Sequence, residues 1–176
     1  SHQFLVGKTM LPTHNSVDGA LTGLYMLSAD HENGAEVYSG ATTEKQALEV
    51  FRPAWLMADK SEGFKESFGL SLSGTPKNPT SIYKLDDMSR FELVIGNPGD
   101  GASPHCAIID EYHEHKAGDQ YDTMETGMGA REEPLMYVIT TAGDNLAGPC
   151  YEMHLKAIKI LEGSIQDDSF FTIIFS

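Results

Sequence analysis

Short apolar segments alternate along this chain with segments that carry apolar residues at helical spacing. Apolar runs at residues 3–6, 35–41, 106–109, 135–141 and 170–175 have the length of buried strands. Helices are expected at residues 19–29, 43–57, 119–129 and 149–162, and shorter strands at 68–74, 81–85 and 91–95. This order of elements predicts an α/β domain of three layers with a mostly parallel central sheet.

Residues 7–18 interrupt the pattern and are expected to be irregular, because Pro12 and Asp18 stand among other polar residues. Two details support the helices that come later. Thr43 is followed three residues on by Gln46, which is the spacing of a capping box, and Gly163 is placed to end the last helix.

Composition limits the classes of function that need to be considered. The 176 residues suffice for one domain with its own core, and 26 acidic against 12 basic residues give a net charge of −14. Such a chain is a poor non-specific DNA binder, because that binding depends on Lys and Arg. Cys106 and Cys150 form neither a disulfide framework nor a zinc set, and no apolar run reaches the ~18–20 residues of a membrane span. A reducing cytoplasm is the simplest compartment.

The apolar run at residues 106–109 ends in two adjacent carboxylates, Asp110 and Glu111. The C-terminal tip of a buried parallel strand is where α/β proteins bind ligands. This is the form of a Walker B element, in which Asp110 holds Mg²⁺ and Glu111 orients or deprotonates the attacking water. A strand that ends at a solvated turn gives the same pattern.

Two other segments bear on the same site. The next strand ends in Thr140-Thr141-Ala142-Gly143, and parallel strands bring their C-terminal ends to one edge, so these hydroxyls are expected beside the carboxylates. Near the N-terminus, Gly7-Lys8-Thr9 matches the tail of a phosphate-binding loop, although the leading glycine four residues earlier is missing.

His113 and His115 follow the carboxylates closely. Together with Asp110 and Glu111 they allow a second interpretation, a metal hydrolase that uses these four residues as ligands. A solvated loop rich in His and Glu explains the same residues without any function.

Taken together, the chain resembles the N-terminal ATPase domain of the large terminase subunit of tailed phages, the motor that packages DNA into proheads. The segments that carry the resemblance, in order, are 23–27, 34–39, 41–43, 95–104, 106–115, 126–131, 139–143 and 148–151. They extend from about residue 20 to the end of the chain, and as an ordered set they are highly specific.

The resemblance implies a P-loop ATPase of the additional-strand, catalytic-glutamate class that uses ATP and Mg²⁺. Asp110 would be the magnesium carboxylate and Glu111 the catalytic glutamate. Thr140, Thr141 and Gly143 would form the coupling motif, which links hydrolysis to movement, and Gly7, Lys8 and Thr9 are the candidate phosphate loop.

The N-terminus departs from the family pattern. The family's phosphate loop reads like Pro-Arg-Lys-Asn-Gly-Lys-Ser, and counting back without gaps places its Lys-Ser on Asn15-Ser16. Matching Gly7-Lys8-Thr9 instead requires roughly seven extra residues before the helix. Three alternatives stay open: Lys8 serves after an insertion, the loop is damaged, or residues 1–18 do not belong to the domain.

The resemblance also implies an organisation for the whole protein. Residues 1–18 form an atypical or disordered N-terminal segment, residues 19–176 form a C-terminally truncated ATPase domain, and the nuclease domain of the family is absent. The full-length protein would be a ring oligomer in the host cytoplasm that acts on double-stranded DNA with a small subunit and a portal, without a membrane. An arginine supplied by a neighbouring subunit would be Arg52, Arg90 or Arg131.

The expected function is therefore that of an ATPase that drives DNA translocation. The first alternative is a catalytically inactive remnant with the same fold, and the second is the metal hydrolase.

Overall fold

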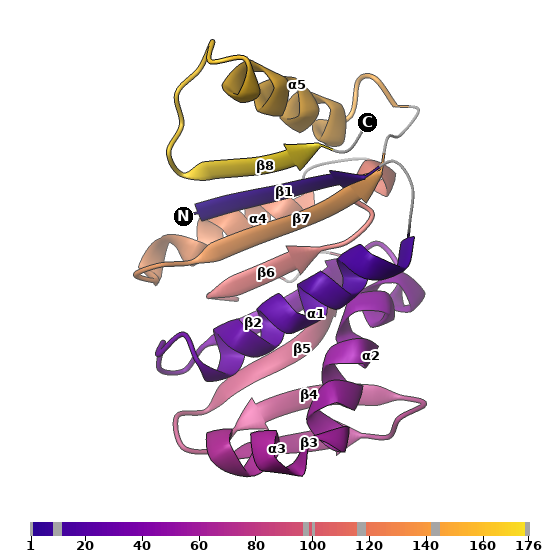
Figure 1. Cartoon of the computed structure of the whole chain (residues 1–176), viewed down its shortest axis with the longest axis vertical. Helices are drawn as coiled ribbons and strands as arrows, with labels where there is room; N and C mark the ends of the chain where they lie inside the picture. Colours follow the sequence, from indigo (N-terminus) through magenta and orange to yellow (C-terminus); the bar gives the residue numbers. More distant parts are fainter. Residues whose placement is uncertain are drawn as a thin grey trace.

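The computed structural model describes residues 2–8, 12–96, 99, 101–115, 119–141 and 145–174, with only the backbone of residues 2–8 and 12–15. One eight-stranded sheet runs through the domain (Figure 1). Its strands are β1 (His2–Lys8), β2 (Glu36–Ala41), β3 (Leu70–Gly74), β4 (Pro79–Lys84), β5 (Ser89–Ile95), β6 (Cys106–Ile109), β7 (Leu135–Thr141) and β8 (Phe170–Ile174). The helices are α1 (Pro12–Ser28), α2 (Glu44–Lys60), α3 (Glu62–Phe68), α4 (Asp119–Gly127) and α5 (Pro149–Leu161), with 3₁₀ turns η1 (Tyr112–Glu114) and η2 (Met128–Ala130).

The strand order is β3-β4-β5-β2-β6-β7-β1-β8. From β5 to β8 all neighbouring strands are parallel, whereas β3, β4 and β5 pair antiparallel at one end of the sheet. The parallel strands all place their C-terminal ends on one edge. The predicted α/β fold with a mostly parallel central sheet is confirmed.

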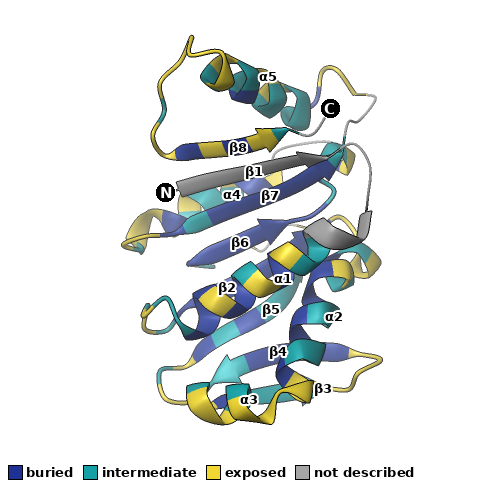
Figure 2. Ribbon diagram, in the orientation of Figure 1, coloured by how far each residue is buried: buried dark blue, intermediate teal, exposed yellow. Residues whose placement is uncertain are grey.

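Helices cover the sheet on both faces. Helices α1 and α2 lie on the face toward the viewer in Figure 1, and α4 lies behind the strands. Successive residues of a strand face opposite ways, so Ile108 packs into the core beneath α1 and α2 while Ile109 joins the core beneath α4 and α5. Figure 2 shows the central strands β2, β6 and β7 as almost continuously buried. Strands buried on both faces explain the continuous apolar runs.

Two elements differ from the sequence prediction. Helix α1 begins at Pro12, so the expectation of an irregular segment as far as residue 18 is wrong for its second half. Proline is favoured in the first turn of a helix, where its missing N–H has no partner to lose. Helix α3 was not predicted, because it has only seven residues and its apolar face consists of one half-buried pair, Phe64 and Phe68.

Helix α1 can lie close to the sheet because it carries Gly23. A Cβ at this position would lie 2.5 Å from Phe91 Cε1 and 3.0 Å from Ile108 Cδ1. The Phe91 ring is fully buried and packs edge-on against Phe51 at 5.1 Å, so it has little room to move. The close approach therefore requires glycine.

We expect Gly23→Ala to destabilise the domain by about 1–3 kcal/mol, since overpacking a buried contact forces neighbours away. Gly63→Ala in α3 is the matched control, because a Cβ there meets nothing within 4 Å. In a helix, alanine is favoured over glycine by roughly 1 kcal/mol, so the control should be neutral or stabilising. Urea unfolding of both variants measures the difference, and equal stabilities would contradict this account of the α1 contact.

Candidate functional site

Residues from three separate segments meet at the C-terminal edge of the parallel strands. Asp110 follows β6, Thr140 and Thr141 end β7, and β1 ends with Gly7 and Lys8 in register with these two threonines. The sequence prediction that the carboxylates and hydroxyls share one edge agrees with this arrangement. Gly143 and Thr9 lie outside the described residues.

Asp110 is a buried carboxylate, with 4% of its surface exposed. Burial, together with the negative charges of Glu111 and Glu49, raises its pKa to about 6. The Glu111 N–H donates to its Oδ1 at 2.9 Å, and a hydrogen bond from the Ser16 hydroxyl also favours the ionised form. Among the described side chains, no Lys or Arg forms an ion pair with Asp110.

Ser16 is a site residue that the sequence reasoning did not select. It lies in the second turn of α1, the helix that directly follows β1, and its hydroxyl reaches the Asp110 carboxylate. A hydroxyl in the helix after the first strand, beside an aspartate at a strand tip, is the pair that holds Mg²⁺ in phosphate-loop enzymes. The signal was present in the sequence, because the gapless comparison places the family's Lys-Ser on Asn15-Ser16.

Glu111 has an unusual backbone conformation. Its φ of 50° lies in the left-handed region, which non-glycine residues seldom adopt and which is concentrated at functional sites. The side chain is one-third exposed, and its Oε2 lies 3.3 Å from His113 Nδ1. This oxygen is buried, and within the described part of the chain it accepts no hydrogen bond of good geometry. The carboxylate is therefore turned toward the end of β7.

The coupling-motif hydroxyls contact the segment that follows Glu111. Thr140 is buried, and its Oγ1 accepts a hydrogen bond from the His113 backbone N–H at 3.1 Å and donates to the Thr141 carbonyl at 3.1 Å. The same hydroxyl lies 3.4 Å from the Cys150 thiol at the start of α5. The end of β7 is thus joined to the carboxylate segment and to α5.

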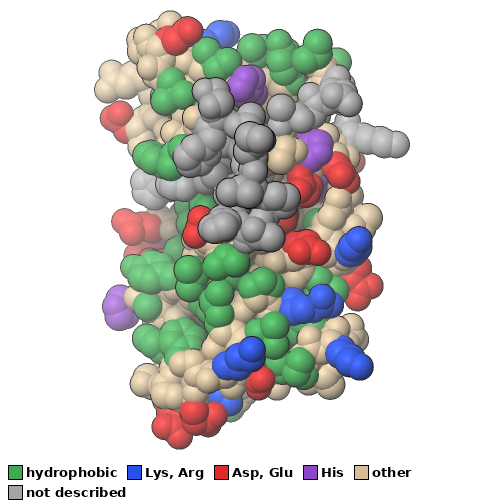
Figure 3. Space-filling view, turned by 45° about the vertical axis from the view of Figure 1, so that its right-hand side comes forward, with side chains coloured by type: hydrophobic (Ala, Val, Ile, Leu, Met, Phe, Trp, Pro, Cys, Tyr) green, Lys and Arg blue, Asp and Glu red, His purple; other side chains and the backbone are tan. Residues whose placement is uncertain are grey.

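The candidate phosphate loop lies next to this cluster. Gly7 and Lys8 are the last residues of β1, and α1 begins only four positions after Lys8, at Pro12. The assignment of Gly7-Lys8-Thr9 as the phosphate loop stays a prediction. Figure 3 shows acidic and histidine side chains gathered in the middle of this face of the molecule.

The two histidines differ in their surroundings. His115 is buried, its ring lies 5.4 Å from that of Tyr112, and burial lowers its pKa. His113 lies on the side of Glu111 and the threonines. Within the described ranges, no group of three or more His, Cys, Asp or Glu residues is arranged to hold a metal ion.

Two of the three arginines are occupied at the opposite edge of the sheet. Arg131 donates to Glu32 and Gly34, both of which precede β2, and Arg90 pairs with Glu36 at the start of β2. Arg52 on α2 donates to the Lys77 carbonyl at 3.2 Å. The sequence positions of Arg90 and Arg131 near the motifs therefore do not bring them to the strand tips.

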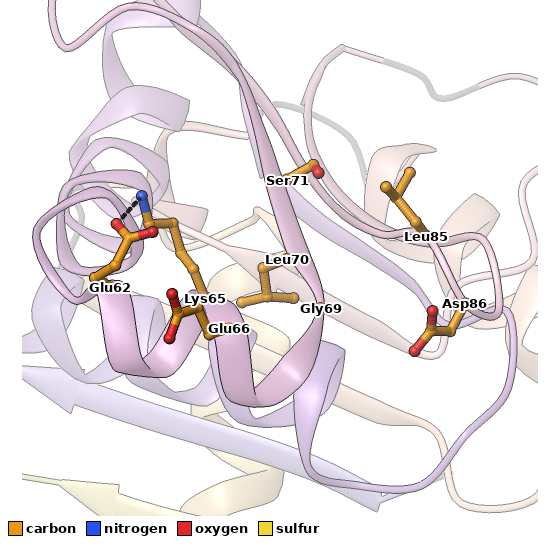
Figure 4. A pocket seen from close by; sticks show the side chains of 8 residues that line it. All are labelled: Glu62, Lys65, Glu66, Gly69, Leu70, Ser71, Leu85 and Asp86. Carbon is orange, nitrogen blue, oxygen red and sulfur yellow. Dashed lines mark ion pairs between the residues drawn. The ribbon is translucent and has the colours of Figure 1, made fainter.

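An open depression lies elsewhere on the domain (Figure 4), between α3 and the turn that follows β4. Acidic side chains, including Glu66 and Asp86, stand around it, and its Lys65 is already paired with Glu62 at 2.8 Å. It has no contact with the strand-tip cluster, and its charge does not suit a nucleotide.

No described helix is long and apolar enough to cross a membrane.

Residues 13–159 match the family described as the terminase large subunit, ATPase domain. Protein YmfN of Escherichia coli K12 is 56% identical over 97 residues, which are 55% of this chain and 21% of that protein. The large terminase subunit of Enterobacteria phage HK97 is 26% identical over 138 residues, which are 74% of this chain and 26% of that protein. The chain thus spans about a quarter or less of each relative.

Solved structures show the same architecture. The crystal structure of the HK97 large terminase superposes with a TM-score of 0.74 at 18% identity, covering 98% of this chain and 35% of that one. The large terminase ATPase domain of Thermus phage P74-26 gives a TM-score of 0.68 at 16% identity, covering 99% and 76%. Both likenesses concern the fold.

Proposed function

Because this chain belongs to the family of terminase large-subunit ATPase domains, we propose that it binds ATP with Mg²⁺ at the strand tips and hydrolyses it. The observation that carries the proposal is the buried Asp110 carboxylate, which has the Ser16 hydroxyl as a partner and no cation among the described side chains. The negative charges of Glu111 and Glu49 also act on this carboxylate, and a bound divalent cation would offset them.

The donor set fits magnesium. Mg²⁺ prefers oxygen ligands and retains several waters, so one carboxylate from Asp110 and one hydroxyl from Ser16 suffice beside the phosphates. When bound, the ion supplies charge stabilisation to the phosphates. Lys8 is the last residue of β1 at the same edge, and with Gly7 and Thr9 it would supply the phosphate loop.

The remaining residues position the attacking water and sense the bound nucleotide. Glu111 orients the attacking water and takes up its proton as the bond to the γ-phosphorus forms and the bond to the ADP oxygen breaks. Thr140, Thr141 and Gly143 form the coupling motif, which senses whether the γ-phosphate is present. In the full-length protein this cycle would drive double-stranded DNA into proheads from a ring in the host cytoplasm, together with a small subunit and a portal.

The organisation of the whole protein belongs to the same proposal. An N-terminal segment of residues 1–18 and an ATPase domain of residues 19–176 stay predictions, as does a nuclease domain beyond this chain. Because the net charge is −14, DNA contacts would fall to a few local basic residues or to parts outside this chain. Arg52 is the candidate for action on a neighbouring subunit, because Arg90 and Arg131 are held at the far edge.

One observation favours the inactive remnant as a second candidate. In the gapless register Asn15 stands where the family has its phosphate lysine, and Ser16 in the next position does contact Asp110. A domain that relies on this register would hold the ion without the lysine that stabilises the transferring phosphoryl group.

Replacing Lys8 separates the two candidates. If Lys8 supplies the phosphate cation, Lys8→Ala should lower Mg²⁺-dependent ATP turnover by roughly 100-fold, the usual effect of removing one charge-stabilising group. Lys60→Ala, an exposed lysine at the C-terminal end of α2, is the control and should leave turnover unchanged. Turnover that survives Lys8→Ala contradicts the phosphate-loop assignment, and a wild-type chain without turnover supports the remnant.

A further inference from the structure

One nitrogen atom of the site lies within contact distance of three oxygen atoms. His113 Nδ1 is 3.3 Å from Glu111 Oε2, 3.3 Å from Thr141 Oγ1 and 3.4 Å from Thr140 Oγ1. The first oxygen belongs to the proposed catalytic carboxylate and the other two to the coupling motif. His113 is thus the side chain that contacts both parts of the proposed machinery.

We propose that His113 is a positioning residue whose Nδ1 atom binds either the Glu111 carboxylate or the Thr141 hydroxyl of the coupling motif, and that it orients Glu111 only while this hydroxyl is engaged elsewhere. The inference rests on the proposed ATPase function. It assigns to His113 a role in regulating the same site.

The chemistry of the imidazole makes the two contacts compete. Nδ1 carries either one proton or one lone pair, so it makes one strong hydrogen bond at a time. A carboxylate accepts only from a protonated Nδ1, whereas a threonine hydroxyl can accept from Nδ1–H or donate to the bare nitrogen. Nδ1 lies 3.3–3.4 Å from all three oxygens, so it is shared among them and has no single close partner.

The backbone of His113 is anchored to the end of β7, and Glu111 lies directly before this anchored turn. The His113 N–H donates to Thr140 Oγ1 at 3.1 Å, which anchors η1 to the end of the strand. Glu111, directly before η1, has the left-handed φ of 50°. A left-handed backbone conformation costs about 1–3 kcal/mol, and a turn of Glu111 into a common conformation would release this strain. Coupling between the two sites depends on such a two-state element.

The presence of the γ-phosphate determines how Glu111 is oriented during the ATPase cycle. When the Thr141 hydroxyl binds a γ-phosphate it withdraws from Nδ1, which then holds the Glu111 carboxylate toward the water, while Thr140 keeps the His113 backbone anchored. After the phosphate leaves, the Thr141 hydroxyl returns and competes for the nitrogen. Glu111 is thus oriented only when a γ-phosphate is present, which prevents its misdirected action in the empty site.

Turnover measurements test the role with a conservative rescue. His113→Ala should lower kcat by roughly tenfold while KM changes by less than about twofold, because Glu111 is disoriented and nucleotide contacts remain. His113→Asn should restore part of the loss, since its amide places a polar atom near the position of Nδ1. His154→Ala on α5 is the control for removing a half-buried histidine. An unchanged kcat in His113→Ala, or no difference between Ala and Asn, would overturn the proposal.

A second measurement needs no turnover. In NMR spectra of the nucleotide-free chain, Glu111→Gln and Thr141→Val should each shift the His113 ring signals, and the double variant should not give the sum of the two shifts. Additive shifts, or a ring that ignores either change, would show independent contacts and overturn the proposal. Absence of ATP turnover in the wild-type chain contradicts the proposed function instead, so the two failures are distinguishable.

Discussion

Asp110→Asn is expected to make the nucleotide-free domain more stable above pH 6, although it removes the proposed magnesium ligand. Burial raises the pKa of Asp110 from 3.8 to about 6, which corresponds to about 3 kcal/mol between the neutral and ionised forms. For a chain of this length that is a rise in melting temperature of roughly 6–12 °C. Asparagine keeps an oxygen that accepts the 2.9 Å hydrogen bond from the Glu111 N–H, so little else is lost.

The sign of the stability change in Asp110→Asn follows from how the stability of the wild type depends on pH. Below pH 3.8 the carboxyl group is protonated in the folded and the unfolded chain, and its stabilising contribution is complete. Between pH 3.8 and about 6 the folded chain keeps a proton that the unfolded chain releases, so stability falls as the pH rises. The advantage of Asp110→Asn should therefore grow through this window and level off above it.

Thermal melts from pH 4 to pH 8 measure the difference. Asp59→Asn, at an exposed position on α2, is the control and should follow the wild type at every pH. An Asp110→Asn variant that melts at or below the wild-type temperature at pH 7.5 would contradict the buried, cation-free carboxylate.

Glu111→Gln is expected to lower ATP turnover by at least 100-fold while Mg²⁺–ATP binding persists. A positioned general base contributes about 10²–10⁴ to a rate, and glutamine cannot take up the proton of the attacking water. Asp110 and Ser16, which are proposed to bind the ion, are unchanged in this variant. Steady-state phosphate release and equilibrium ATP binding are the two measurements.

Glu114→Gln provides the matched control within the same segment. Glu114 is exposed, accepts a hydrogen bond from Gln46 and does not face the threonines. It should retain turnover. Comparable rates in Glu111→Gln and the wild type would remove Glu111 from the catalytic role, whatever the role of Asp110.

The edge that carries the site was predictable because the position of a strand tip follows from the sequence. Residues 106–109 are continuously apolar and β7 ends in two threonines, so parallel pairing alone brings Asp110 and Thr140 together. The fold class followed from the same alternation of strands and helices. The fold class and the strand tips both follow from the spacing of apolar residues, which a single sequence contains.

Other features depended on contacts that periodicity does not record. Pro12 reads as an interruption but occupies the first turn of α1, and that shift brings Ser16 to Asp110. The link from His113 to Thr141 joins residues 28 positions apart. Arg131 stands near the motifs in sequence, yet its partners Glu32 and Gly34 hold it at the other edge. Each of these follows from tertiary packing.

If Asp110 marks a working Mg²⁺–ATP site, calorimetric titration will detect nucleotide binding that depends on this carboxylate. ATP is titrated into the wild-type chain and into Asp110→Asn, in each case with and without Mg²⁺. The account predicts binding by the wild type that requires Mg²⁺ and is lost in Asp110→Asn, although the variant is the more stable protein. Absence of heat at millimolar ATP in the wild type, or equal binding by the variant, would contradict it.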